Sequence, residues 1–319
     1  MSTGANFEPP VGTGGGEILV IKHGALGDFI LSMGPFAAIR AHHPEARITL
    51  LTTAPFEEVA RRSGYFDRIW CDSRASAWNA LARLGLRRRL RGGGFSRVYD
   101  LQTSRRSSAY YRYFAPPRPE WSGIARGCSH PHANPERDGM HTVARQREQL
   151  AMASIDAVGE ADISWLDGDI SGLAPAEPYI LLVPGGSAHR PEKRWPASCY
   201  GELASMLAEA GYPPLLLGAA AESAVLAEIN AICPAARNLG GRTDFGQIAA
   251  LARRAAAAVG NDTGPMHIIA STGCAATVLF SGASDPALTV PHGPAVQLLQ
   301  RPNLADLAAA EVRASLTLP

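Results

Sequence analysis

The sequence places a carboxylate beside glycine at two points where a strand gives way to a helix. At one of them, Asp262 follows the apolar run 255–259 and is followed by Thr263, Gly264 and a helix-like run ending at Thr272. In open α/β sheets, ligands bind beyond the carboxyl ends of strands, where helix N-termini offer free N–H groups to an anion. This stretch therefore predicts an anion-binding turn, and the alternative is that Asp262 only caps the helix.

The second point is the loop that ends at Asp28. A β-rich run at 17–22 leads into Gly24 and Gly27, and a helix-like pattern continues over 29–41. Two glycines allow a ligand to approach the backbone closely, but the third glycine of a dinucleotide fingerprint is missing. We therefore expect a ligand-facing loop that is not an NAD site, and the alternative role for Asp28 is again a helix cap.

The elements that position these residues alternate between strands and helices in both halves of the chain. Such alternation predicts α/β domains with parallel, doubly wound sheets, and 319 residues suit two of them. We expect a flexible tail over 1–16, one domain over 17–160, a linker over 161–178 and a second domain over 179–319. Two such domains leave a cleft between them, which is the usual place for a site.

Composition narrows the class of protein. The chain has 46% hydrophobic and 18% charged residues, which allows a sizeable core. No apolar run is long enough to span a bilayer, and the first 16 residues lack the apolar core of a signal peptide. Five scattered cysteines argue for reduced thiols rather than a disulfide framework. We therefore predict a cytoplasmic protein. Peripheral contact with the inner face of the cytoplasmic membrane is compatible with this prediction.

Charge is distributed unevenly along the chain. Residues 1–160 hold 21 Lys and Arg against 15 Asp and Glu, a net formal charge of +6, whereas 161–319 hold 9 against 14, a net of −5. Much of the excess is an arginine run over 83–91. A solvated helix face is the ordinary explanation, and a surface for anionic lipid or phosphorylated glycan is the alternative. No recognition motif accompanies the run, so nucleic acid is not expected.

Lysine is almost absent, since only Lys22 and Lys193 occur among the 30 basic residues. An ammonium is a compact point charge that a guanidinium does not replace, which singles out Lys193; for Lys22, chance is the favoured explanation.

Two patterns that resemble metal sites are rejected. His130, His132 and His141 lie in or next to a Pro- and His-rich segment, 116–139, that shows no period and is expected to be functional or mobile. Their spacing does not suit zinc. Asp167-Gly168-Asp169 falls in the linker, where a turn is the better interpretation than a metal-binding D-x-D.

Four motifs together resemble one enzyme family, the ADP-heptose:lipopolysaccharide heptosyltransferases of glycosyltransferase family 9. They occur in family order over about residues 17–290: Gly24-Ala25-Leu26-Gly27-Asp28, Pro184-Gly185-Gly186-Ser187 with Lys193-Arg194-Trp195-Pro196, Asp262-Thr263-Gly264-Pro265-Met266-His267, and Phe280 with Asp285-Pro286. The resemblance implies a GT-B fold of two Rossmann-like domains. It also implies inverting, metal-independent transfer of heptose or a related sugar from an ADP-sugar to lipopolysaccharide core or another lipid-linked or phosphorylated glycan.

The resemblance also implies roles for single residues. Asp28 matches the general base and Lys193 the group that binds the pyrophosphate. Glu222 resembles the residue that holds the ribose, and the backbone near Thr243 the adenine contact. Asp262 is expected to bind sugar hydroxyls and His267 to reach phosphate. Further contacts to the nucleotide-sugar are expected from Gly27, Gly186, Ser187, Thr263 and Gly264. No cofactor is expected besides this co-substrate.

One segment departs from the family pattern. The loop 188–192 is a residue or two longer than usual, which leaves open which hydroxyl or N–H meets phosphate. The same transfer with another nucleotide-sugar is one alternative. A GT-B-shaped isomerase that binds a nucleotide-sugar without an acceptor is a second, and a binding module without activity is a third.

Overall fold

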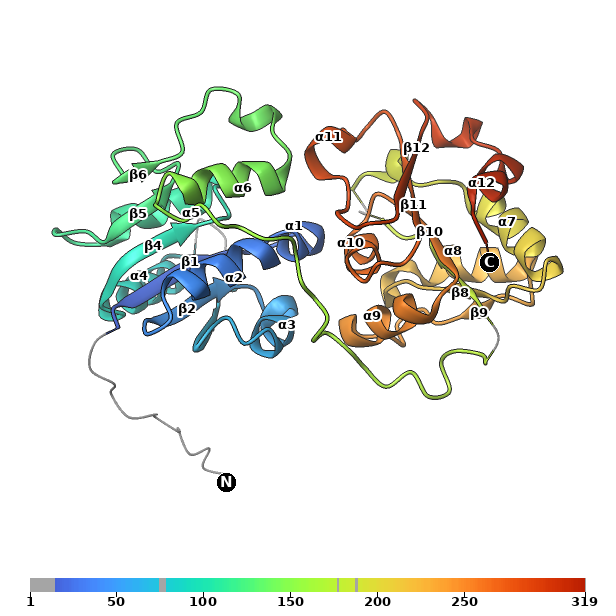
Figure 1. Cartoon of the computed structure of the whole chain (residues 1–319), viewed down its shortest axis with the longest axis horizontal. Helices are drawn as coiled ribbons and strands as arrows, with labels where there is room; N and C mark the ends of the chain where they lie inside the picture. The colour runs from blue at the N-terminus through green and yellow to red at the C-terminus, as the bar shows by residue number, and fades with distance from the viewer. Residues whose placement is uncertain (1–14, 75–78, 177, 187–188, 319) are drawn as a thin grey trace.

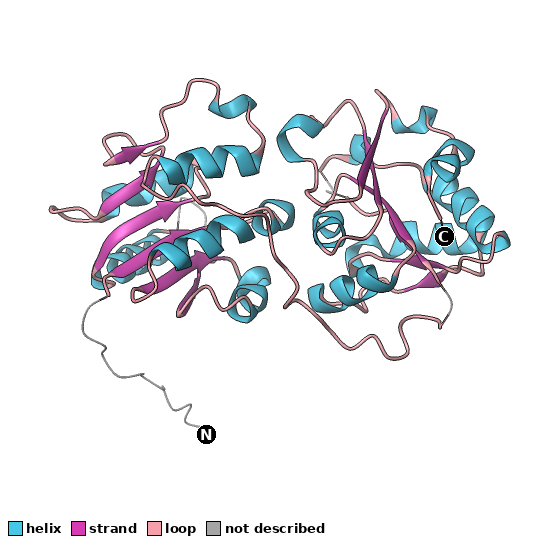
Figure 2. Ribbon diagram, viewed as in Figure 1, coloured by secondary structure: helices cyan, strands magenta, loops and turns pink. Residues whose placement is uncertain are grey.

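The structure is a computed structural model that describes residues 15–74, 79–176, 178–186 and 189–318 (Figure 1). It contains two parallel six-stranded sheets with helices on both faces (Figure 2). The strand order is β3-β2-β1-β4-β5-β6 in the first sheet and β12-β11-β10-β7-β8-β9 in the second. Counted within each sheet, the two orders are the same, 3-2-1-4-5-6, which is the doubly wound order of dinucleotide-binding folds. The predicted fold class is confirmed.

The N-terminal lobe comprises the first sheet and its helices. Its strands are β1 (Glu17–Ile21), β2 (Arg47–Thr52), β3 (Arg68–Cys71), β4 (Phe95–Asp100), β5 (Glu120–Gly123) and β6 (His130–Pro131). Its helices are α1 (Leu26–Ile30), α2 (Met33–His42), α3 (Glu57–Arg62), α4 (Ala80–Gly92), α5 (Arg105–Tyr110) and α6 (Thr142–Ala151).

The C-terminal lobe comprises the second sheet and its helices. Its strands are β7 (Ile180–Val183), β8 (Pro214–Leu216), β9 (Arg237–Asn238), β10 (Ala257–Asn261), β11 (Ala276–Phe280) and β12 (Val296–Gln300). Its helices are α7 (Ala197–Glu209), α8 (Ser223–Ile232), α9 (Phe245–Arg254), α10 (Gly264–Ser271), α11 (Pro286–Thr289) and α12 (Ala309–Ser315).

Alternation along the central strands explains why both faces of each sheet are covered. In β1, Ile18 and Val20 belong to one core cluster with side chains of α1, α2, α3 and α6, whereas Leu19 and Ile21 pack with side chains of α4 and α5. Successive side chains of a strand point to opposite faces, so an all-apolar strand needs helices on both sides. β7 follows the same rule: Leu181 shares a cluster with α9 and α10, and Leu182 packs among α7, α8 and α12.

The helix expected over 29–41 is wrong, because the chain forms two helices, α1 and α2, that are separated at Leu31 and Ser32. Pro35 lacks an N–H to donate to the carbonyl of Leu31, and its ring opposes a continuous helix there. The Ser32 hydroxyl instead donates to the carbonyl oxygen of Asp28 at 2.7 Å. The short α1 therefore ends just after Asp28 and fixes the turn on which this residue lies.

Most of the segment 116–139 is irregular, as the sequence suggested, but two short stretches of it form strands. It contributes β5 and β6, which extend the first sheet beyond β4 in parallel. β5 has four residues and β6 two, which is too short for any alternation of apolar and polar residues to be visible in the sequence.

The connection between the lobes contains no helix or strand in its described residues from 152 to 179, and contacts both lobes. Arg253 of α9 donates to the carbonyl oxygens of Leu166 and Ile163, each at 2.8 Å, and Arg62 of α3 donates to that of Asp167 at 2.5 Å. Asp167 and Asp169 accept bonds from backbone N–H groups next to them in the chain, as expected for a turn.

Candidate active site

The candidate site lies where the topology of both sheets predicts one. In each sheet the strand order reverses between two neighbouring strands, β1 and β4 in the first and β7 and β10 in the second. Ligands bind in the crevice beyond the carboxyl ends of strands at such a switch point. The segments that follow β1, β7 and β10 carry Asp28, in α1, and Gly186 and Asp262, in loops. In Figure 1, α1 and α10, the helices that follow β1 and β10, face each other between the lobes.

A recess of about 310 Å³ opens between these helices. It is lined by residues of both lobes: Ala25, Leu26, Gly27, Asp28, Lys193, Asp262, Thr263, Gly264, His267 and Thr289. Seven of the residues singled out in the sequence therefore lie around one cavity, although up to 240 positions separate them in the chain.

Asp28 lies on the N-terminal side of this recess and does not cap a helix. It is the third residue of α1, and the N-cap residue is Ala25. Its carboxylate Oδ1 faces the Thr142 hydroxyl of α6 at 3.4 Å, and the Arg145 guanidinium donates to that hydroxyl at 3.2 Å. Among the described residues, the contact with Thr142 is the one side-chain hydrogen bond of the half-buried carboxylate, which leaves it lone pairs with which to accept a proton.

Asp262 also does not cap the helix that follows it, because the N-cap residue of α10 is Thr263. Its Oδ2 accepts a bond from the Lys193 ammonium at 2.7 Å and one from the Ser284 hydroxyl at 2.8 Å. The two charged side chains are 15% and 9% exposed. The pair holds an ammonium beside the N-terminus of α10, where an anion would meet a cation and free N–H groups together.

His267 closes the floor of the recess. Its ring is 4% exposed, and its Nδ1 has no hydrogen-bond partner among the described residues. Burial lowers the pKa of His267 to about 4, although Asp262 and Asp28 act in the opposite direction. The imidazole is therefore neutral at neutral pH, so it can donate a hydrogen bond but brings no charge.

Two glycines allow α1 and α10 to approach this closely. A Cβ atom at Gly27 would lie 2.5 Å from Nε2 of His267, and one at Gly264 would lie 2.7 Å from Cβ of Leu26. Neither distance leaves room for a methyl group. The two helix N-termini therefore meet across the lobes at positions that have no side chain.

The glycine loop after β7 is held by Glu222. One carboxylate oxygen accepts the N–H of Gly186 at 2.8 Å and the other accepts that of Ala219 at 2.8 Å, while Arg194 donates to the carbonyl of Gly186 at 2.7 Å. Neither Glu222 nor Gly186 lines the 310 Å³ recess. The predicted contact at Ser187 lies outside the described residues.

Thr243 lies apart from the other predicted residues. It lines a separate recess of about 290 Å³, formed with Pro55, Glu58, Val59, Arg62, Leu166, Asp244, Phe245 and Gly246. This recess is also built from both lobes, between α3 and the start of α9. The sequence offered no sign that residues 55–62 would contribute to it.

Two polar contacts of the site, and one buried cation near Asp28, were not assigned a role in the sequence. Thr142 reaches Asp28 from a helix 114 positions away, and no local pattern marks it. Ser284 belongs to a loop that was recognised but not assigned a role. Lys22, for which chance was favoured, is 3% exposed and donates to the carbonyl of Leu101 at 3.3 Å. Burial lowers its pKa to about 8, and the nearby Asp28 carboxylate partly offsets this effect.

The histidines of the Pro- and His-rich region have separate partners. His130 bonds the Ser129 hydroxyl, His132 accepts from the Arg137 guanidinium, and His141 reaches the carbonyl of Val290 across the lobes at 3.1 Å. His141 also stacks on His292 of the C-terminal lobe, with ring centroids 4.9 Å apart.

Two Rossmann-like lobes that face one another, with a recess between the helices that follow β1 and β10, have the GT-B architecture of glycosyltransferases. A model of glycosyltransferase family 9 (heptosyltransferase) matches residues 83–313. The chain belongs to this family and is a glycosyltransferase.

Individual relatives agree with this assignment. The chain is 29% identical over 303 residues to lipopolysaccharide heptosyltransferase 2 of Salmonella typhimurium, covering 86% of this chain and 85% of the relative. The solved structure of the Escherichia coli ADP-heptose LPS heptosyltransferase II is similar in fold, with a TM-score of 0.75 at 23% identity over 93% of this chain and 96% of that one. A family 9 glycosyltransferase from Veillonella parvula has a TM-score of 0.79 at 19% identity, over 94% and 95% of the chains.

Proposed function

We propose that the protein transfers heptose, or a closely related sugar, from an ADP-sugar to a lipopolysaccharide core or a similar surface glycan, with inversion and without a metal. The family and the lipopolysaccharide heptosyltransferase relatives support the reaction class. The observation that carries the mechanism is the single recess that gathers Asp28 from one lobe with Lys193 and Asp262 from the other.

In the proposed reaction, Asp28 accepts the proton of the acceptor hydroxyl. The acceptor oxygen then forms a bond to the anomeric carbon, while the bond from that carbon to the diphosphate breaks. A carboxylate within reach of the hydroxyl serves as general base. Thr142 would orient this carboxylate, since its hydroxyl is the described side-chain partner of Asp28.

The leaving nucleoside diphosphate gains negative charge, which Lys193 and the N–H groups of Thr263 and Gly264 would stabilise. Preorganised cations and backbone donors can supply this stabilisation without a metal ion. His267 would donate a hydrogen bond from its neutral ring. Asp262 would hold Lys193 in place and accept bonds from sugar hydroxyls with its other oxygen.

Glu222 and Thr243 have weaker support as nucleotide contacts. Both oxygens of Glu222 bind backbone N–H groups, so we propose that it shapes the glycine loop first and meets the ribose with its remaining lone pairs. The recess at Thr243 would take the adenine, and a base bound there would contact α3 as well as α9.

The proposal is tested by incubating the protein with ADP-heptose and a heptose-deficient lipopolysaccharide core. ADP should be released only when the acceptor is present, and the rate should be unchanged in excess EDTA. The anomeric configuration of the product, read by NMR, should be opposite to that of the donor. Release of ADP without acceptor, retention of configuration or loss of activity in EDTA would each contradict one part of the proposal.

The donor is tested independently of the acceptor. A ligand that binds only the folded protein raises its melting temperature by mass action. ADP and ADP-heptose should therefore raise the melting temperature, and UDP, GDP and CDP should do so less at equal concentration. A larger shift with another nucleotide would assign a different donor while leaving the reaction class intact.

A further inference from the structure

The outer face of the N-terminal lobe around α4 and α5 carries an excess of arginine side chains that have no role in the proposed reaction. From residue 79 to residue 118 the sequence has ten arginines and one acidic residue, Asp100; one of the ten, Arg97 on β4, is paired with Glu120 and does not belong to this surface. Asp100 is fully buried, and burial raises its pKa to about 6, so it offers little negative charge at the surface. We call this surface, which also includes the neighbouring residues 124–126, the α4–α5 face.

Large apolar side chains are exposed on the same face. Leu81 is 83% exposed and Leu84 is 42% exposed, both on α4, and Ile124 after β5 is 38% exposed. Leu81, Leu84 and Arg88 follow the spacing i, i+3, i+7, which places them on one side of the helix. The opposite side is anchored, because Leu90 is buried in the core and Arg89 stacks over Trp70 at 4.2 Å.

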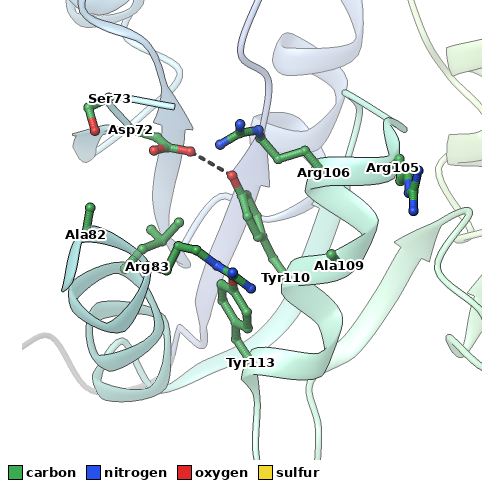
Figure 3. A pocket seen from close by; sticks show the side chains of 10 residues that line it. Asp72, Ser73, Ala82, Arg83, Arg105, Arg106, Ala109, Tyr110 and Tyr113 are labelled. Atoms are coloured by element: carbon green, nitrogen blue, oxygen red, sulfur yellow. Dashed lines mark hydrogen bonds between the residues drawn. The ribbon is translucent and has the colours of Figure 1, made fainter. Parts of the chain in front are cut away.

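A recess of about 360 Å³ lies between α4 and α5 (Figure 3). Its lining includes the guanidinium-bearing side chains of Arg83, Arg105 and Arg106. The carboxylate of Asp72 also lines it, but accepts a bond from the Tyr110 hydroxyl at 2.7 Å. With three arginines and one carboxylate, the lining of this recess has a positive formal charge.

A second recess of about 330 Å³ lies on the other side of α5 and shares Arg105 with the first. Arg112, Arg126 and Ile124 are among its lining residues. Within the described ranges, Arg105 itself makes no hydrogen bond or ion pair. The α4–α5 face therefore presents two adjoining hollows lined by arginines, with Ile124 lining the second, while Leu81 and Leu84 are exposed on the outward side of α4.

We propose that the α4–α5 face docks on an anionic phospholipid bilayer, with a headgroup phosphate bound in the recess that is lined by Arg83 and Arg106 on one side of α5 and by Arg105 on the other. Guanidinium groups bind phosphate oxygens through paired, charge-assisted hydrogen bonds. Helices with basic and apolar side chains on one exposed side lie in the membrane interface, where the apolar residues enter the acyl boundary. A purely polar ligand such as a glycan would gain nothing from Leu81 and Leu84, so these two residues favour the bilayer.

Docking in this way would bring the candidate active site close to the membrane. Asp72, which lines the recess, follows β3, and Asp28 follows β1 at the same carboxyl edge of the sheet. His23 lies between them, with its Nε2 atom 3.6 Å from Oδ2 of Asp72. A lipid-anchored acceptor could therefore meet the Asp28 recess without leaving the bilayer.

The test is flotation of the full chain with vesicles, without donor or acceptor, so that it is independent of the proposed transfer reaction. Vesicles of phosphatidylglycerol and phosphatidylcholine should bind the protein, vesicles of phosphatidylcholine alone should bind it much less, and high salt should weaken the binding. Equal binding to both vesicle types, or binding to neither, would overturn the proposal.

A matched pair of variants tests the face itself. The variant L84S/R88E should lose roughly 30-fold in affinity for the anionic vesicles, from one apolar contact and one reversed charge. The control I232S/R254E changes the same residue classes on exposed positions of the C-terminal lobe, where Ile232 is 43% exposed. It should bind as the unmodified protein does. Equal losses in both variants would contradict a specific face.

The recess is tested with Arg105→Gln, which should lose roughly fivefold in affinity for phosphatidylglycerol vesicles. Each variant is checked for an unchanged melting temperature. If Arg105→Gln binds the vesicles as tightly as the original chain, a headgroup phosphate does not bind in this recess. Full displacement of the protein from vesicles by a water-soluble phosphorylated core oligosaccharide would assign the face to a glycan and overturn the docking proposal.

Discussion

The ion pair between Lys193 and Asp262 gives the sharpest prediction. Removing Lys193 alone should lower both the stability of the fold and the affinity for the donor, whereas removing both charges should restore only the stability. Lys193→Met removes the ammonium 2.7 Å from Oδ2 of Asp262 and leaves a carboxylate that is 9% exposed. Breaking a fully buried ion pair costs about 3–5 kcal/mol. Ser284 still donates to the orphaned carboxylate, and the recess admits water, so we expect a loss of about 2 kcal/mol in the free energy of unfolding.

The double variant K193M/D262N removes the orphaned charge as well. It should recover stability to within about 1 kcal/mol of the original chain, since replacing both partners of a buried pair is often nearly neutral. Donor binding should not recover. A charge-assisted hydrogen bond contributes about 1.5–3 kcal/mol, so the affinity for ADP should fall roughly 10- to 100-fold in both variants.

Urea unfolding followed by circular dichroism measures the first quantity, and titration calorimetry with ADP measures the second. Lys193→Arg, which keeps the positive charge, serves as the control and should stay close to the original chain in stability. The reasoning is refuted if Lys193→Met unfolds at the same urea concentration as the original, or if K193M/D262N binds ADP normally.

Three further predictions follow from the same recess. Asp28→Ala should lower turnover by about three orders of magnitude with less than a threefold change in ADP affinity, and unchanged turnover would remove Asp28 as the base. Burial lowers the pKa of His267 to about 4. Between about pH 6.5 and pH 4 this imidazole is therefore protonated in the unfolded chain but not in the folded chain. The free energy of unfolding should therefore decrease as the pH is lowered through this window. His267→Gln should make the decrease at pH 4.5 smaller by about 2 kcal/mol. An equal decrease in both proteins would contradict the assignment. Gly264→Ala should force α10 away from Leu26 and raise the KM for donor at least several-fold, measured by initial rates, whereas Gly159→Ala, at a glycine with no atom within 4 Å of the added Cβ and no positive φ, should not.

The sequence was sufficient to predict the fold, and to indicate several residues that line one recess, because both depend in part on local patterns. Strands followed by glycine turns and helices are visible without a structure, and parallel strands bring their carboxyl ends to one edge. Asp28, Asp262 and Gly264 could therefore be expected near a common cleft from their positions after β1 and β10. The recess shows that these residues do lie together; their chemical roles stay predictions.

Contacts between distant segments could not be predicted in this way. Thr142 meets Asp28 only because α6 packs beside α1 and α2, and Ser284 meets Asp262 only because the loop after β11 folds back. Thr243 and α3 form a recess whose two halves carry no shared pattern. The break at Leu31 was visible in principle, since Pro35 opposes a continuous helix, but the apolar period over 29–41 concealed it.

No helix among the described residues is long and apolar enough to cross a bilayer. The sequence suggested that the arginine run is an ordinary solvated surface. If the α4–α5 face docks as proposed, the exposed Leu81 and Leu84 are the feature that distinguishes it from such a surface. Their exposed side chains cannot be recognised in the sequence, where leucine in a helix ordinarily indicates a core position.

Gly27 and Gly264 each lie against a side chain of the opposite lobe, Gly27 against His267 and Gly264 against Leu26. A Cβ atom at Gly27 would lie 2.5 Å from the His267 ring, and one at Gly264 would lie 2.7 Å from Leu26, so a methyl group at either position would hold the lobes apart locally. The width of the recess is therefore set by two positions, far apart in the chain, at which hydrogen is the largest substituent that fits.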